Sequence, residues 1–159
     1  MSDPALVVLQ RPEGGFPHAP GCDGAIRLPH VAAAVPLARR ALTRELRRSH
    51  TPQDAVDGVE VVVSELLGNA VRHAEPIEGG DVLLRWRIRP GAVEVEVVDG
   101  GCAGTGAGVQ VVAPDADATG GRGMHLVSSI ADAWGTTDDG HGQHAVWASV
   151  ATGTTARVA

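Results

Sequence analysis

The sequence predicts an α+β domain in which helices pack on a largely antiparallel sheet. Apolar residues recur at helical spacing through residues 52–74, which indicates a helix with a buried face. Two segments with strand character, residues 81–88 and 92–98, are separated only by a short turn. A further helix and two short strands are expected near the C-terminus. At 159 residues the chain fits one domain, which buries roughly 70% of the surface that its unfolded form exposes.

The N-terminal region combines a proline-rich arm with the first strand and helix. Residues 1–24 are rich in proline and glycine, so we expect a flexible arm with at most a short strand at residues 5–9. Residues 26–28 predict an edge strand. Pro36 suits the first turn of a helix. The apolar spacing of that helix predicts four inward residues, which are Leu37, Ala41, Leu42 and Leu46.

The other face of this first helix carries an arginine cluster, which consists of Arg39, Arg40, Arg44, Arg47 and Arg48. Two interpretations are open. A solvated helix face is the more common explanation for such a charge run, and a docking surface for an acidic protein is the alternative.

The second helix has clear boundaries in the sequence. Thr51 is expected to cap it, with Pro52 at the first helical position and Asp54 in a capping-box pattern, and Pro76 should stop it just past Ala74. Its apolar stripe is predicted to face the sheet and consists of Val56, Val59, Val63, Leu66, Leu67 and Ala70.

The remaining elements follow a simple order. The strands at residues 81–88 and 92–98 should pair antiparallel, and alternation of valine with Glu94 and Glu96 predicts one buried and one wet sheet face. Residues between Gly101 and Gly120 lack a helical period, and we interpret them as a mobile lid. A helix over residues 122–131 then leads to strands near 134–137 and 145–150. We place the folded domain at residues 25–151, with a tail at 152–159.

Composition excludes several kinds of chemistry. The net charge of −6 argues against a protein that binds nucleic acid by neutralising phosphates. All thirteen basic residues are arginine, so a P-loop lysine and a Schiff base are excluded. Cys22 and Cys102 form no Cys-x-x-Cys pair, and a reducing cytoplasm is the expected location. We expect neither a membrane span nor an export signal, since no apolar run is long enough.

Three short polar motifs carry the functional signal. Glu65, Asn69 and His73 are four residues apart and therefore line one side of the second helix. An Asp99-Gly100-Gly101 turn follows an alternating strand, and Gly120-Gly121-Arg122-Gly123 opens the next helix, where free N–H groups and the helix dipole favour an anion.

Each of these residues has a chemical interpretation and a structural one. Asn69 offers a neutral oxygen suited to Mg²⁺, and Glu65 one turn earlier suits a general base near a terminal phosphate. Asp99 is able to accept a hydrogen bond from an exocyclic amine, and Gly101 leaves room for a flat ring. Taken singly, each residue is better explained as a hydrogen-bonded polar group or a turn former. The combination of all of them in one sequence favours the chemical interpretation. His141 and His144 beside two aspartates are better explained as a hairpin than as a metal site.

Together the three motifs closely resemble those of the GHKL ATPase/kinase superfamily with its Bergerat fold. The resemblance covers roughly residues 25–150. Within the superfamily, the chain is similar to anti-sigma-factor serine kinases in two segments, which are Val63 to His73 and the final strand with Val146 and Trp147. It implies a two-layer α/β sandwich with a mixed, mostly antiparallel sheet and helices on one face. It also implies ATP and Mg²⁺ as cofactors.

The resemblance assigns roles to named residues. It implies Asn69 as the Mg²⁺ ligand, Glu65 as the general base and Asp99 as the acceptor of the adenine amine. Gly101, Gly121 and Gly123 would line the nucleotide pocket, with Met124 in the same motif and His73 and Arg122 as supports. Two positions depart from the family pattern: Ala103 replaces a glycine, and Ala145 replaces a threonine used near the adenine.

The leading hypothesis is an ATP-dependent kinase that phosphorylates a serine or threonine of an anti-anti-sigma-like partner and that releases or sequesters a sigma factor. Two alternatives stay open, which are an ATP-binding switch without phosphoryl transfer and a stand-alone histidine-kinase catalytic domain. A homodimer is compatible with each hypothesis, and direct nucleic-acid binding is not expected.

Overall fold

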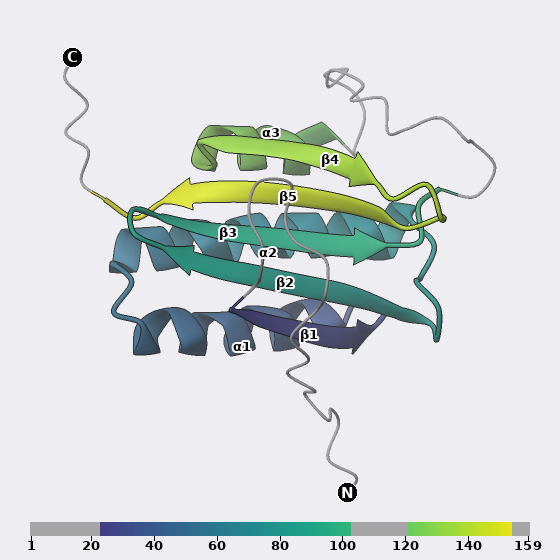
Figure 1. The fold of residues 1–159 in the computed structure, drawn as a ribbon, viewed down its shortest axis with the longest axis horizontal. Coiled ribbons are helices and arrows are strands. Elements are labelled where there is room, and N and C mark those ends of the chain that lie inside the picture. Colours follow the sequence, from purple (N-terminus) through teal and green to yellow (C-terminus); the bar gives the residue numbers. More distant parts are fainter. Residues whose placement is uncertain (1–22, 103–120, 154–159) are drawn as a thin grey trace, which may run out of the picture.

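The computed structural model describes residues 23–102 and 121–153, and these form one sheet covered by helices (Figure 1). The elements in chain order are β1 (Gly24–Pro29), α1 (Ala34–Arg48), α2 (Gln53–His73), β2 (Asp81–Arg89), β3 (Ala92–Asp99), α3 (Gly121–Ile130), β4 (Ala133–Asp138) and β5 (His144–Ala151). The sheet order is β1-β2-β3-β5-β4, and every pairing among these strands is antiparallel. The predicted α+β fold class is confirmed.

The helices lie on one face of the sheet and bury an aliphatic core against it (Figure 1). All six residues of the predicted α2 stripe are buried. They meet Val93, Val95 and Val97, which alternate along β3 and point to the same side. Burial of the valine and leucine side chains contributes about 1.5–3 kcal/mol each, so packing against the sheet holds α2 in place.

Two local predictions about the helices are wrong. Leu37 is 39% exposed, because the buried face of α1 is set by Ala34, Ala38, Leu42 and Leu46. Thr51 does not cap α2: its hydroxyl contacts Ser49 Oγ, Pro52 takes the N-cap position, and no side chain caps the helix there. The helix nevertheless ends at His73, just before Pro76, as predicted.

The prediction of a wet second sheet face is also wrong. Glu96 is only 3% exposed and Arg87 only 2% exposed on the face that points away from the helices. Cross-strand register places Arg85 opposite Glu96 and Arg87 opposite Glu94, at N–O distances of 3.3 and 2.8 Å. Because each charge faces an opposite charge on the neighbouring strand, these polar side chains tolerate burial that isolated charges would not.

The buried carboxyl of Glu96 makes the stability of the fold depend on pH. Burial raises the pKa of its carboxyl above the ordinary 4.5, and the charges of Arg85 and Arg87 oppose that rise. A raised folded-state pKa means that the folded protein binds this proton more tightly than the unfolded chain. The contribution of Glu96 to stability is therefore largest below its unfolded pKa and is lost as pH rises through the folded pKa.

The variant Glu96→Gln removes this titration. We expect the free energy of unfolding of the wild type, relative to Glu96→Gln, to fall as the pH rises from the ordinary pKa of 4.5 through the raised pKa of the folded protein. Urea denaturation at several pH values measures it, with Glu78→Gln at an exposed position as the control. Parallel pH profiles for wild type and Glu96→Gln would contradict the assignment.

Several predictions concern residues outside those described. The arm, apart from Asp23 and Gly24, lies there, as do residues 103–120 of the predicted lid and residues 154–159 of the tail. Within the described ranges, none of the helices combines the length and apolar character needed to cross a membrane.

Candidate functional site

Glu65, Asn69 and Gly123 come together where α3 crosses α2. Glu65 and Asn69 are half-buried on adjacent turns of α2, as their spacing predicts. A Cβ atom on Gly123 would overlap Glu65 Oε2 and would lie 3.6 Å from Asn69 Oδ1. Only glycine therefore leaves the Glu65 carboxylate in place, and the start of α3 lies close to both polar groups.

Asp99 ends β3 in a tight turn. Its carboxylate is 3% exposed, and Oδ1 accepts a hydrogen bond from Gly101 N at 2.8 Å. Gly101 has φ +74°, a left-handed conformation that glycine adopts without strain. The turn-forming role of Asp99 and a ligand role are compatible, because the hydrogen bond to Gly101 uses only one of the two carboxylate oxygens.

This turn is tied to the segment just after α2. Glu75 N donates to Gly101 O at 2.8 Å, and Gly100 N donates to Glu75 O at 2.8 Å. A Cβ atom on Gly100 would overlap the Pro76 carbonyl oxygen. The Asp99–Gly101 turn is thus anchored near the C-terminal end of the same helix that carries Glu65 and Asn69.

His144 is the neighbour of Asp99 that sequence reasoning missed. The β3–β5 register pairs the two residues, and His144 Nδ1 lies 3.4 Å from Asp99 Oδ1. Both side chains are buried. Ala145, at the position where the resemblance expects a threonine, instead belongs to a small apolar cluster with Ile77 and Val98. The polar group next to Asp99 is therefore an imidazole from the preceding position.

The other predicted site residues lie in the last turn of α2 and the first turn of α3. His73 is exposed in the last turn of α2, and its carbonyl oxygen accepts a 3.6 Å contact from Cys102 Sγ. Met124 is half-buried and packs against the core. Gly121 and Arg122 begin α3, and their side-chain surroundings lie outside the described part of the chain.

The histidine and aspartate residues before β5 form a hairpin, as expected. Asp138 Oδ1 accepts a hydrogen bond from the backbone N–H of Gly140. Asp139 Oδ1 accepts hydrogen bonds from the backbone N–H groups of His141 and Gln143. The His141 N–H is the main cause of the lowered pKa of Asp139. Among the described residues, no group of three or more histidine, cysteine or acidic side chains is arranged to hold a metal.

The α2 residues fit a magnesium ion that is shared with a ligand. Asn69 Oδ1 accepts a long hydrogen bond from Arg72 Nη2 at 3.3 Å, and an amide oxygen has two lone pairs, so this oxygen retains acceptor capacity. Mg²⁺ commonly takes one or two protein oxygens and completes its shell with water and substrate phosphates. A single amide oxygen beside a glycine-lined helix start meets that requirement.

A comparison with protein families covers the part of the chain that carries these residues. The family model described as "Histidine kinase-like ATPase domain" matches residues 28–149, which span β1 to β5 and every motif above. No significant match was found among curated proteins. The match supports ATP binding, and its extent over most of the sequence shows that the chain belongs to the histidine kinase-like ATPase family.

Proposed function

We propose that this protein is an ATP- and Mg²⁺-dependent kinase of the anti-sigma-factor type. It transfers the terminal phosphoryl group of ATP to a serine or threonine of an anti-anti-sigma-like partner in the cytoplasm, and it regulates a sigma factor. Family membership supports the ATP-binding part of this proposal. The closeness of Gly123 to Glu65 and Asn69 supports phosphoryl transfer, because a helix N-terminus lies beside a carboxylate and an amide. The anti-sigma-factor type and the partner are proposed from the resemblance of the sequence motifs.

Each residue has a defined role in the proposed mechanism. Asp99 accepts a hydrogen bond from the adenine amine, and Gly101 lets the base approach the turn. Asn69 would hold Mg²⁺ through its Oδ1 atom, and the ion would supply positive charge that neutralises the phosphates. The backbone at Gly121 and Gly123 binds phosphate oxygens at the start of α3. Glu65 accepts the proton of the attacking hydroxyl.

Phosphoryl transfer is tested with γ-labelled ATP, the full chain and candidate partner proteins. Label on serine or threonine supports the proposal. Acid-labile label on histidine would identify a histidine-kinase catalytic domain, and tight ATP binding without transfer would identify a switch module. Failure to bind ATP would exclude all three.

The adenine contact gives a separate prediction. Asp99→Asn replaces a charged acceptor with a neutral amide and should weaken ATP binding by ~1.5–3 kcal/mol, about one to two decades in Kd. Calorimetry with Mg²⁺ present measures the change. Asp138→Asn makes the same substitution at an exposed turn carboxylate and serves as the matched control. An unchanged Kd for Asp99→Asn would remove Asp99 from the adenine site.

A further inference from the structure

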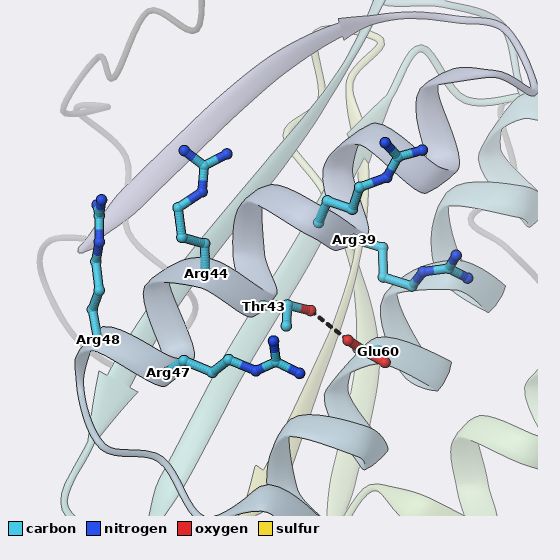
Figure 2. A pocket seen from close by; sticks show the side chains of 7 residues that line it. Arg39, Thr43, Arg44, Arg47, Arg48 and Glu60 are labelled. Carbon is cyan, nitrogen blue, oxygen red and sulfur yellow. Dashed lines mark hydrogen bonds between the residues drawn. The ribbon is translucent and has the colours of Figure 1, made fainter.

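A second polar surface lies on α1, away from the candidate nucleotide site. An open hollow of about 540 Å³ is lined by Arg39, Arg40, Thr43, Arg44, Arg47, Arg48 and Glu60 (Figure 2). We call this the arginine surface. On its floor Thr43 Oγ1 donates a 2.6 Å hydrogen bond to Glu60 Oε1, which joins α1 to α2. In Figure 2, Arg44 and Arg48 project away from α1, whereas Arg47 points towards Thr43 and Glu60.

The stability of α1 does not explain these arginines. Like charges at i,i+3 and i,i+4 destabilise a helix by about 0.2–0.5 kcal/mol per pair, and Arg44 forms such pairs with Arg40, Arg47 and Arg48. The helix dipole favours Arg47 and Arg48 in the last turn, but it does not favour the three arginines nearer the helix start. Repulsion within the cluster therefore lowers the stability of α1, and binding of an anionic partner would offset that loss.

Among the described residues, most of the charge on this surface has no ion-pair partner. Arg48 forms an ion pair with Glu45 at 3.0 Å. Within residues 23–102 and 121–153, no ion pair is found for Arg39, Arg40, Arg44 or Arg47, and all four are exposed. These guanidinium groups stand on a chain whose net charge is −6, so positive potential is concentrated on one helix.

The side chains of the arginine surface favour carboxylates over a membrane or a single-stranded nucleic acid as the anionic partner. A basic amphipathic helix binds a membrane through its apolar face, but the apolar face of α1 is buried in the core. Single-stranded nucleic acid is usually held by aromatic stacking as well as charge, and the described side chains that line this hollow include no aromatic residue. Carboxylates, in contrast, match the guanidinium fork directly.

We propose that the arginine surface binds an acidic helical segment of a partner protein. Arg40, Arg44 and Arg47 fall within a sector of about 60° on α1, because each residue advances about 100° around a helix. They span about 10 Å along the helix axis. A partner helix with acidic residues at positions i, i+4 and i+7 presents carboxylates over the same length. We expect the acidic segment to bind this surface whether or not ATP is present.

Fluorescence anisotropy with the full chain tests the proposal. The probe is a labelled helical peptide with glutamates at i, i+4 and i+7, and its glutamine analogue is the control probe. We expect the glutamate peptide to bind about tenfold tighter or more, and to weaken as salt is raised. Equal binding of the two peptides would overturn the proposal.

Two charge reversals locate the contact. Arg44→Glu should weaken binding of the glutamate peptide at least about fivefold, whereas Arg89→Glu, an equal charge change at an exposed position at the end of β2, should change it less than about twofold. Arg44→Glu should leave ATP binding unchanged, so failure here and failure of the proposed kinase function are distinguishable. Equal loss in both variants, or displacement of the peptide more readily by single-stranded DNA or anionic vesicles than by unlabelled peptide, would overturn the proposal.

Discussion

Glu65→Gln should slow phosphoryl transfer by about two to four decades and leave ATP binding almost intact. The change keeps the size of the side chain and its place beside Gly123 but removes its ability to accept a proton. General-base catalysis contributes about 10²–10⁴ in rate, so we expect a loss of that size. The rate of label transfer from ATP to the acceptor protein, with Kd from calorimetry on the same sample, measures both effects.

Glu60→Gln is the matched control for this variant. Glu60 lies on the same helix and is also partly buried, but it contacts Thr43 on the arginine surface. Its substitution should leave transfer within about twofold of wild type. A parallel loss of transfer and of ATP affinity in Glu65→Gln would show that Glu65 supports the pocket and is not the base.

Gly123→Ala should lower transfer strongly without unfolding the protein. The added methyl group would overlap Glu65 Oε2, the end of a side chain that is able to turn aside. Alanine also favours the helix by up to about 1 kcal/mol relative to glycine, so the free energy of unfolding should be unchanged or higher. Because a displacement of about 1 Å costs up to about 10² in rate, we expect a fall of that order.

Gly153→Ala provides the comparison, since a Cβ atom there meets nothing within 4 Å. Transfer rates and urea denaturation of both variants separate a displaced carboxylate from a destabilised fold. Wild-type transfer in Gly123→Ala would show that the contact between α3 and Glu65 is not part of the reacting centre. A large loss of stability would show that the Glu65 side chain has no room to move.

Local spacing predicted most of the fold. The helical period of α2 identified its buried stripe and placed Glu65 and Asn69 on one side, because that geometry depends only on neighbouring turns. The hairpin of β2 and β3 followed from alternation and from the turn at Gly91, which has φ +86°. Leu37 was misplaced because two apolar stripes along α1 are nearly equivalent in sequence, and packing selects between them.

Contacts between distant segments were not predictable in the same way. His144 reaches Asp99 only because β5 pairs with β3, which precedes it in the chain and is separated from it by α3 and β4. Alternation in β3 shows which residues share a sheet face, but it does not show whether that face is covered. The burial of Glu96 therefore emerged only from the structure.

Calorimetry of the full chain with ATP, in the presence of Mg²⁺ and again with the ion removed, measures whether this protein binds the nucleotide through the metal. We expect binding with Mg²⁺, weaker binding without it, and a further loss in Asp99→Asn. No binding heat from adenine nucleotides at millimolar concentration with Mg²⁺ present, and no displacement of a fluorescent ATP analogue, would show that the protein is not an ATP-dependent kinase.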